Sequence, residues 1–332
     1  MALVLTESNV RALLTMEQTI ELMEDALRAY STGAVVQPVR LAVSAERHGG
    51  LLALMPAYVT TSEALGAKAV TFYSRNAERN LPTHMATILL WESGTGELLA
   101  IMDGRLITEV RTAAVSAAAS RALARPDAGV LALLGAGVQA RSHLDALRLV
   151  RPIRDVRVWS RTPGHAEAFA GDVALRQAQG EREASAVRAV PTAEEAVRDA
   201  DLICTVTSAT EPVLRGAWIS PGAHINAVGA PRPTWRELDS AAVAQARCYV
   251  DSRAGALAES GDLLLPMQEG AITEEHIVGE IGEVLAGTVA GRTAPGDVTL
   301  FKSLGMAVED VVTAHYVYTR ALAEGIGRQI EI

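Results

Sequence analysis

Apolar residues in the middle of the chain form short continuous runs, and each run is followed by a stretch with helical spacing. Val130 to Leu134 leads directly into a glycine-rich turn, after which Leu144, Leu147 and Val150 recur on one helical face. A second strand-like run, Asp155 to Trp159, follows a short loop. This alternation predicts parallel strands with intervening helices from about Ala128 onward. Further strands are expected at 201–206, 224–228, 248–251 and 299–302.

The N-terminal part has a different pattern. Thr15 and Gln18 form a capping box ahead of an apolar stripe, which predicts a helix ending near Gly33. Strand-like runs follow it, and Ser93 to Gly96 predicts a hairpin between two antiparallel strands. These strands are expected at 39–44, 51–55, 67–72, 87–92 and 98–102. A last helix, about 307–323, is expected to return to this part of the chain.

Together these patterns predict an α/β protein in which a Rossmann-type dinucleotide-binding domain is inserted into a second α/β domain. The family resemblance given below implies that this second domain binds substrate and forms dimers. The expected substrate-binding and dimerisation domain comprises residues 1–117 and 306–332, and the nucleotide-binding domain comprises 118–305. The polar, alanine-rich patch at 176–186 is expected to be an exposed helix end and loop.

The turn after the first of the parallel strands indicates a pyrophosphate-binding site. Gly135 to Ala140 reads Gly-Ala-Gly-Val-Gln-Ala, with alanine as the allowed variant of the third glycine. Glycines let the backbone turn sharply and approach a phosphate, and the helix that follows points its free N–H groups at the negative charge. The turn therefore predicts a dinucleotide cofactor.

Composition narrows the classes of function. The 332 residues are 49% hydrophobic and carry a formal charge of -9 with no basic block, so nucleic acid is not an expected partner. The two cysteines, Cys204 and Cys248, lie in apolar segments and are expected to be buried thiols of a cytoplasmic protein. No apolar stretch is long enough to cross a bilayer, so no membrane association is expected.

Three cations lie in apolar segments of the N-terminal part: Arg40, Lys68 and Arg111. A buried cation without a partner is costly, so each needs a carboxylate or a bound anion. A structural explanation is pairing with Glu46, Glu109 or another acid. A functional explanation is a small carboxylate substrate, which would satisfy all three cations at once.

Other polar residues give weaker signals. His143, His165, His276 and His315 have no acid or cysteine at metal-ligand spacing, so no metal site is expected. Ser116 and Ser120 lie on an alanine-rich helix without a local base, which argues against a serine hydrolase.

At its motifs the chain resembles the ornithine cyclodeaminase/μ-crystallin family over nearly its whole length. The matching segments are residues 68–73, 82–87, 102–104, 111–116, 135–140, 226–229, 259–262 and 301–310. The resemblance implies a homodimer built from the first domain and the last helix, with NAD(P) in the middle domain.

The resemblance also implies roles for single residues. Arg40, Lys68 and Arg111 would hold the substrate carboxylate, with Lys68 also near the reacting nitrogen. Thr83 and His84 would line the cleft between substrate and nicotinamide, although His84 could instead be an interior histidine. The implied catalytic residues are Lys68, His84 and Arg111. Glu259 would bind substrate, unless it and Asp262 only cap and solvate a helix end. Implied cofactor contacts are Thr83, His84, Arg111, Gly135, Gly137, Val138, Gln139, Ser160, Arg161, Thr162, Thr205, Thr207, Val228 and Ser303.

One departure separates the chemistries of the family. Cyclodeaminase members carry an aspartate just after the Val-Gly of the segment matching Asn226 to Gly229, and Pro231 occupies that position here. Proline has no acid–base group, so the stretch looks like the ketimine reductase branch. A protonated C=N accepts hydride readily, so positioning and electrostatics can supply most of the catalysis.

The resulting prediction is an NAD(P)H-dependent oxidoreductase that reduces small cyclic imino acids, Δ1-pyrroline-2-carboxylate or Δ1-piperideine-2-carboxylate, to L-proline or L-pipecolate. The alternatives are an ornithine cyclodeaminase, an alanine dehydrogenase or opine-type reductive amination, and a crystallin-like protein that binds NADPH and a ligand without turnover. NADPH is expected to be preferred over a usable NADH, because Ser160 and Arg161 stand where an NAD-specific fold places an acid.

Overall fold

The computed structural model describes residues 1–178 and 185–331, which divide into two compact units. Unit 1 contains Met1–Thr112 and Gly305–Ile332, and unit 2 is the intervening Ala113–Leu304. The first boundary falls inside helix α3 (Arg105–Leu123). It lies after Thr112 rather than after residue 117, and the second lies after Leu304 rather than after residue 305. Unit 2 is thus inserted into unit 1, as the sequence predicts.

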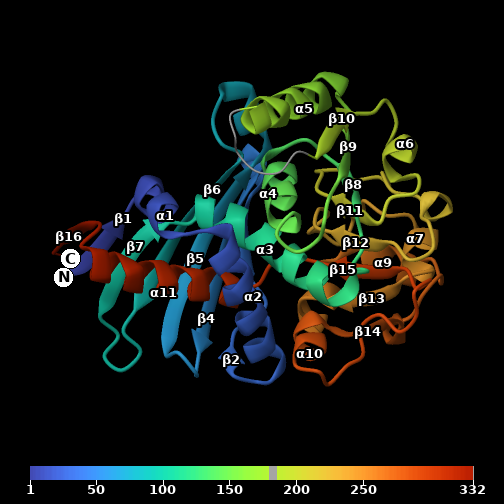
Figure 1. Ribbon diagram of the computed structural model, residues 1–332. Helices are drawn as coiled ribbons and strands as arrows, with labels where there is room; N and C mark the ends of the chain where they lie inside the picture. Colours follow the sequence, from blue (N-terminus) through green and yellow to red (C-terminus); the bar gives the residue numbers. More distant parts are fainter. Residues whose placement is uncertain (179–184, 332) are drawn as a thin grey trace. The chain divides into compact units, whose positions relative to one another are not determined.

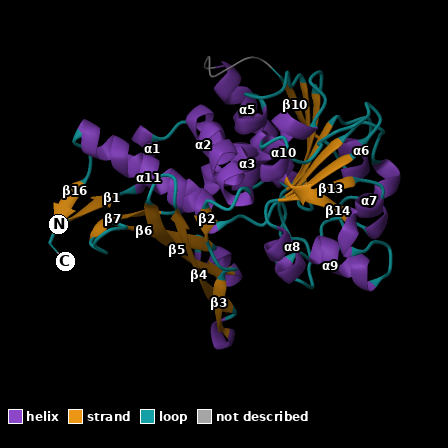
Figure 2. Cartoon of the chain, turned by 90° about the horizontal axis from the view of Figure 1, so that it is seen from below, coloured by secondary structure: helices purple, strands orange, loops and turns teal. Residues whose placement is uncertain are grey.

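Unit 1 is built on one eight-stranded sheet in the order β16-β1-β7-β6-β5-β4-β2, with β3 also paired to β4 (Figure 2). All neighbours are antiparallel except β1 and β7. Its strands are β1 (Ala2–Leu5), β2 (Val35–Val36), β3 (Leu41–Ala45), β4 (Gly50–Val59), β5 (Ala64–Tyr73), β6 (His84–Trp91), β7 (Leu98–Asp103) and β16 (Arg328–Ile330). Its helices are α1 (Glu7–Leu13), α2 (Met16–Ser31) and α11 (Ala307–Glu324).

Helices α2 and α11 cover one face of this sheet, and α11 lies across β4, β5 and β6 (Figure 1). The expected apolar stripe of α2 is buried at Ile20, Met23 and Leu27, and the Thr15 side chain caps the helix by accepting from Gln18 N. On β4 the side chains alternate, with Ala53 and Met55 buried and their neighbours exposed. One face of the sheet therefore forms the core of unit 1.

The opposite face of β3 and β4 exposes large apolar side chains. Leu41 is 61% exposed and Leu54 is 40% exposed, and these two residues are paired across the strands. Val43 and Leu52 form the next pair on the same face. Leu52 is also paired with Thr71 of β5, which in turn is paired with Met85 of β6. We call Leu41, Val43, Leu52, Leu54 and Met85 the apolar face of unit 1.

Unit 2 is a parallel eight-stranded sheet in the order β10-β9-β8-β11-β12-β15-β13-β14. Its strands are β8 (Val130–Leu134), β9 (Asp155–Trp159), β10 (Ala186–Ala189), β11 (Leu202–Thr205), β12 (His224–Ala227), β13 (Arg247–Val250), β14 (Ile277–Glu280) and β15 (Thr299–Lys302). Its helices, besides the end of α3, are α4 (Val138–Leu147), α5 (Pro163–Ala178), α6 (Ala193–Val197), α7 (Ser240–Ala244), α8 (Arg253–Glu259), α9 (Gly261–Gln268) and α10 (Ile281–Leu285).

Both faces of the unit 2 sheet are buried. Leu131 and Leu133 of β8 pack with α4 and α5, whereas Ala132 and Leu134 pack with α6 and α7 on the other face. Consecutive residues thus enter two different cores, which explains why these strands read as continuous apolar runs. The order reverses between β8 and β11, which is the switch point where doubly wound folds bind ligands.

Several elements agree closely with the sequence prediction, and others were not predicted. Strands β8, β9 and β15 and the antiparallel hairpin of β6 and β7 are confirmed, as are the buried thiols of Cys204 and Cys248. Strands β1, β2, β10, β14 and β16 and helices α1 and α10 were not predicted, because a single short segment carries only a weak periodic signal. Of the polar patch 176–186, residues 179–184 lie outside the described residues.

Within the described ranges, no helix combines the length and the hydropathy needed to cross a membrane.

Candidate active site

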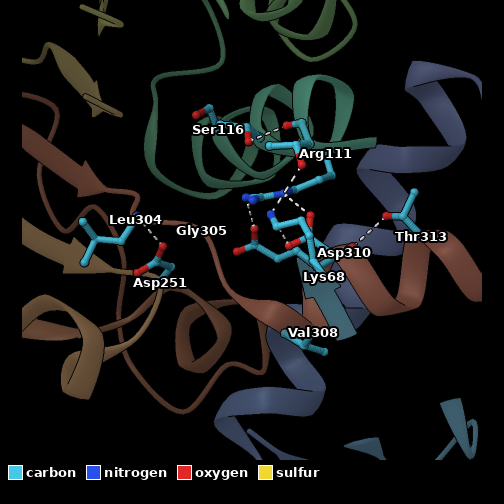
Figure 3. Close-up of polar contacts among 12 residues, drawn as sticks. Lys68, Arg111, Ser116, Asp251, Leu304, Gly305, Val308, Asp310 and Thr313 are labelled. Atoms are coloured by element: carbon cyan, nitrogen blue, oxygen red, sulfur yellow. Dashed lines mark hydrogen bonds and ion pairs between the residues drawn. The ribbon is translucent and has the colours of Figure 1, made fainter. Parts of the chain in front are cut away.

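Unit 1 buries a cluster of charged side chains between β5, α3 and α11 (Figure 3). Lys68 Nζ lies 2.6 Å from Asp310 Oδ2. Arg111 Nε donates to Asp310 Oδ1 at 2.9 Å, and its Nη1 donates to Glu309 Oε2 at 2.5 Å. Asp310 therefore holds both cations, one on each carboxylate oxygen.

Strand register and helix phase bring these residues together. Lys68 lies on β5 opposite Met55 and Ile88, on the buried face that α11 covers. Glu309 and Asp310 occupy the first turn of α11, where carboxylates interact favourably with the helix dipole. The acids thus reach Lys68 and Arg111 from an element that lies far away in the chain, with Asp310 199 residues from Arg111.

Arg40 completes the cluster. Its Nη2 donates to the carbonyl oxygen of Gly305 at 3.0 Å, just before α11. Burial lowers the pKa of Lys68 to about 8, the positive charges of Arg111 and Arg40 act in the same direction, and Asp310 opposes them. We call Arg40, Lys68, Arg111, Glu309 and Asp310 the cation cluster.

Acids do pair with Lys68 and Arg111, as the structural explanation expects, but they are neither Glu46 nor Glu109. Glu46 is exposed, and Glu109 interacts with Arg105. The partners are Glu309 and Asp310, which lie in the last of the family-like segments. The burial of Lys68 and Arg111 therefore does not by itself require a bound anion. The cluster brings three cations and two carboxylates together in the part of unit 1 that the structure describes.

Thr83 and His84 lie at the start of β6, where His84 is paired with Phe72 of β5. The residue as a whole is exposed although its ring is partly covered, so the alternative of an interior histidine is wrong. Its ring centroid lies 4.6 Å from that of Phe72, and its Nδ1 is 3.1 Å from Thr83 Oγ1. Partial burial, together with the charge of Lys68, lowers the pKa of His84 and favours the neutral ring.

In unit 2, the glycine turn has the geometry that a phosphate site requires. Gly135 has φ +122°, and a Cβ there would lie 2.7 Å from the carbonyl oxygen of Val206, so only glycine fits. Gly137 is the N-cap of α4, and a Cβ added to it would have no atom within 4 Å. No side chain of the described residues caps α4. Its first N–H groups are therefore available to an anion.

The end of β9 carries the residues expected to contact the adenosine ribose. Ser160 is half-buried, whereas Arg161 and Thr162 are exposed, ahead of α5. Thr162 N donates to Ser160 Oγ at 3.4 Å. Because β9 is paired with β8, these residues lie beside the glycine turn at the carboxyl ends of the strands.

The other expected cofactor contacts lie along the same edge. Thr205 ends β11, and Val228 and Ser303 directly follow β12 and β15. Among the described residues, Ser303 Oγ and Gln139 Oε1 are buried and have no hydrogen-bond partner. Buried polar atoms are usually satisfied, so both fit hydrogen bonds to a bound nucleotide. We call the carboxyl ends of β8, β9, β11, β12 and β15 the carboxyl edge.

Glu259 and Asp262 differ from each other in environment. Glu259 is half-buried at the end of α8. Asp262 is fully buried in the first turn of α9, where its Oδ2 lies 2.8 Å from Lys302 Nζ. The alternative in which Asp262 solvates a helix end is therefore wrong.

The absence of a base near Ser116 was also a wrong prediction. His143 Nε2 lies 2.9 Å from Ser116 Oγ, and both side chains are fully buried. Burial lowers the pKa of His143 to about 4, which keeps the imidazole neutral. The pair joins α3 to α4, and no local pattern indicates it because the two residues lie 27 positions apart in the chain.

Comparisons with known proteins agree on one family. The sequence profile of the ornithine cyclodeaminase/mu-crystallin family matches residues 1–325. Ketimine reductase mu-crystallin from Mus musculus is 48% identical over 299 residues, which cover 89% of this chain and 90% of that protein.

Two solved structures are similar over the whole chain. Thermococcus litoralis Delta(1)-pyrroline-2-carboxylate reductase, in complex with NADH and L-proline, has a TM-score of 0.94 and 40% identity and covers 99% of this chain and 100% of its own. An archaeal alanine dehydrogenase dimer with bound NAD has a TM-score of 0.91 and 33% identity and covers 100% of this chain and 99% of its own.

Proposed function

Because the chain belongs to the ornithine cyclodeaminase/mu-crystallin family, we propose that it is an NAD(P)H-dependent reductase of small cyclic imino acids. Its substrates are Δ1-pyrroline-2-carboxylate and Δ1-piperideine-2-carboxylate, and its products are L-proline and L-pipecolate. The observation that carries the proposal is the cation cluster, in which two guanidinium groups and a lysine with a pKa of about 8 lie together.

The substrate carboxylate binds to Arg40 and Arg111. Arg111 is held by Glu309 and Asp310, so its planar guanidinium has a fixed orientation. A preoriented cation loses little entropy when it binds an anion, and it fixes the position of the carbon beside the carboxylate.

Lys68 keeps the imine nitrogen protonated. With a pKa of about 8, its ammonium group is the main form at neutral pH but releases a proton more readily than an ordinary lysine. Asp310, 2.6 Å away, orients the ammonium group. A water molecule held by His84 is the alternative group that would keep the nitrogen protonated. Glu259 stays a weaker candidate for substrate binding.

The nucleotide binds to unit 2. When bound, it supplies the hydride that reduces the imine carbon. Gly135, Gly137, Val138 and Gln139 receive its pyrophosphate at the start of α4. Its adenosine ribose lies at Ser160, Arg161 and Thr162, and the rest of the molecule lies along Thr205, Thr207, Val228 and Ser303.

Steady-state oxidation of NADPH and NADH with a panel of substrates tests this proposal. Δ1-Pyrroline-2-carboxylate and Δ1-piperideine-2-carboxylate are expected to give the highest kcat/KM, pyruvate with ammonia a much lower one, and L-ornithine with NAD no appreciable ammonia. Binding of NADPH without turnover of any substrate would indicate a crystallin-like binding protein instead.

The second candidate is an alanine dehydrogenase, which the likeness to the archaeal enzyme favours. A kcat/KM for pyruvate with ammonia above that for both cyclic imines would establish it. An ornithine cyclodeaminase is less favoured, because Pro231 occupies the position of the family's aspartate and has no acid–base group. The residue before it, Ala230, has a strained backbone with φ +56°.

The proposal extends to the assembly. Two copies form a two-fold homodimer through the apolar face of unit 1, since monomeric proteins rarely expose such a contiguous set of large apolar side chains. The cytoplasmic location expected from the cysteines stays a prediction.

A further inference from the structure

Three buried charged side chains fix the loop that follows β12, residues 229–237. Glu237, Asp262 and Lys302 are all 0% exposed, and we call them the Glu237 network. Lys302 Nζ lies 2.8 Å from Asp262 Oδ2 and also donates to the carbonyl oxygen of Gly229. Asp262 Oδ1 accepts from the backbone N–H of Glu237 at 2.7 Å and from that of the next residue at 3.0 Å.

The Glu237 carboxylate joins two loops of the carboxyl edge. Its Oε1 accepts from both N and Oγ1 of Thr207, each at 2.6 Å, and its Oε2 accepts from Gly229 N at 2.8 Å. Thr207 follows β11 and Gly229 follows β12. One side chain thus sets the relative position of the ends of two neighbouring strands.

The packing around this carboxylate leaves no free space. A Cβ on Gly229 would lie 2.4 Å from both Glu237 Cδ and the carbonyl oxygen of Thr207, and one on Gly261 would lie 1.9 Å from the carbonyl oxygen of Trp235. Ala230 adopts φ +56°, a left-handed conformation that alanine disfavours. The loop is therefore held in a conformation that its own sequence does not prefer.

Stability alone does not explain these charges. Two carboxylates and one ammonium group leave an excess negative charge in the interior, and burial together with Asp262 raises the pKa of Glu237. Replacing a buried ion network with apolar residues is often neutral or stabilising. A network that is costly to bury, and that tethers two loops at the edge where doubly wound folds bind ligands, suggests a functional role.

The direction of the nucleotide identifies that role. In doubly wound folds the adenosine ribose lies at the end of the second strand, here β9, and the pyrophosphate lies at the glycine turn after β8. The nicotinamide half therefore continues across the switch point toward β11 and β12, where Glu237 holds both loops.

We propose that Glu237, supported by Asp262 and Lys302, is a positioning residue that shapes the loops after β11 and β12 to receive the nicotinamide half of the nucleotide. It acts through Thr207 and Gly229. The inference rests on the proposed function, because it presumes that unit 2 binds NAD(P)H.

The test compares NADPH with 2′-phospho-ADP-ribose, which lacks the nicotinamide. In Glu237→Gln one acceptor oxygen becomes an N–H2 group facing a backbone donor, so the loops must shift. The Kd for NADPH, measured by its fluorescence, is expected to rise about tenfold, while the Kd for 2′-phospho-ADP-ribose stays within about twofold. Should this variant not fold, the same selective loss is expected in Asp262→Asn.

Asp201→Asn is the matched control. Asp201 Oδ2 also accepts two backbone N–H bonds, from Gly129 at 2.8 Å and Val130 at 3.0 Å, but at the amino end of β8. This variant is expected to lower Tm and leave both Kd values unchanged. Equal losses of affinity for both ligands in Glu237→Gln, or no loss for either, would overturn the inference about Glu237 but not the proposed function. If the wild-type protein binds neither ligand, the proposed function fails as well.

Discussion

Lys68 shows how one buried residue can supply both charge and a proton. Burial and the positive charges of Arg111 and Arg40 lower the pKa of Lys68, because they disfavour its ammonium form. Asp310 raises the pKa, and the resulting value is about 8. A lysine in this balance is protonated at neutral pH, and the protonated form is the one that the proposed reaction uses. The activity should therefore depend on pH through this residue.

For the wild-type enzyme, kcat/KM for Δ1-pyrroline-2-carboxylate is expected to fall as pH rises through about 8, because Lys68 then loses its proton. The arginine in Lys68→Arg stays protonated throughout this range, so the fall in kcat/KM of this variant should move to higher pH or disappear. Lys68→Met should have a lower kcat at every pH. If Lys68→Arg keeps the same fall at the same pH, Lys68 is not the titrating group.

Arg40 lies at the more accessible side of the cation cluster, where it is half-buried. In Arg40→Met the substrate carboxylate should lose a charge-assisted hydrogen bond of roughly 1.5–3 kcal/mol, which lowers kcat/KM about tenfold to a hundredfold. The Kd for NADPH should not change. Arg105→Met is the control, since Arg105 pairs with Glu7 and Glu109 elsewhere in unit 1. Unchanged kinetics in a folded Arg40→Met would exclude Arg40 from carboxylate binding.

Arg161 is expected to determine the cofactor preference. Ser160 does not repel a 2′-phosphate, and the exposed Arg161 guanidinium can pair with one. The wild-type kcat/KM should be higher for NADPH than for NADH, and Arg161→Ala should remove most of this difference. Arg198→Ala, which changes an exposed arginine at the end of α6, should leave it intact. A wild-type preference for NADH would contradict the assignment.

The turn between β8 and α4 shows how a short element combines folding and binding. Its two glycines are required for different reasons: Gly135 has a left-handed backbone and no space for a side chain, whereas Gly137 has φ -87° and open space above it. The first glycine serves the fold and the second serves the approach of a ligand.

Gly135→Ala and Gly137→Ala should therefore behave differently. The strain at Gly135 costs about 1–3 kcal/mol, so this variant should have a Tm lower by roughly 2–12 °C as well as weaker NADPH binding. Gly137→Ala should keep its Tm and still bind NADPH more weakly, because its methyl group occupies the phosphate approach. Normal NADPH affinity in Gly137→Ala would place the pyrophosphate elsewhere.

At the scale of the whole molecule, the apolar face of unit 1 has the composition of an interface rather than of a solvated surface. Leu41 and Val43 are 61% and 56% exposed on β3, and Leu52 and Leu54 continue the same face on β4. A two-fold axis would bring this face against itself, since such an interface is self-complementary.

Light scattering at micromolar concentration should therefore give the mass of a dimer. A charge in the interface would be buried without a partner, so Leu54→Glu should shift the protein toward the monomer. Leu175→Glu is the matched control, because Leu175 is 64% exposed on α5 of unit 2 and should tolerate the change. A monomeric wild-type protein would refute the homodimer.

Features that depend on neighbours along the chain were predictable from residue order. The strands β8, β9 and β15, the helix α2 with its Thr15 cap, and the glycine turn were predicted because periodicity, capping and φ preferences act over a few residues. The insertion of one domain into the other also followed from the order of the elements. Arg40, Lys68 and Arg111 were selected because they are cations in apolar segments, and the family resemblance supplied their expected roles.

The pairing of charges, in contrast, is visible only in the folded chain. Asp310 with Lys68, His143 with Ser116, and Glu237 with the loops after β11 and β12 join residues far apart in the sequence. Their pairing depends on strand register and helix phase, which no local pattern encodes. The pKa of Lys68 depends in turn on that pairing and on burial, so its chemistry is a property of the folded chain.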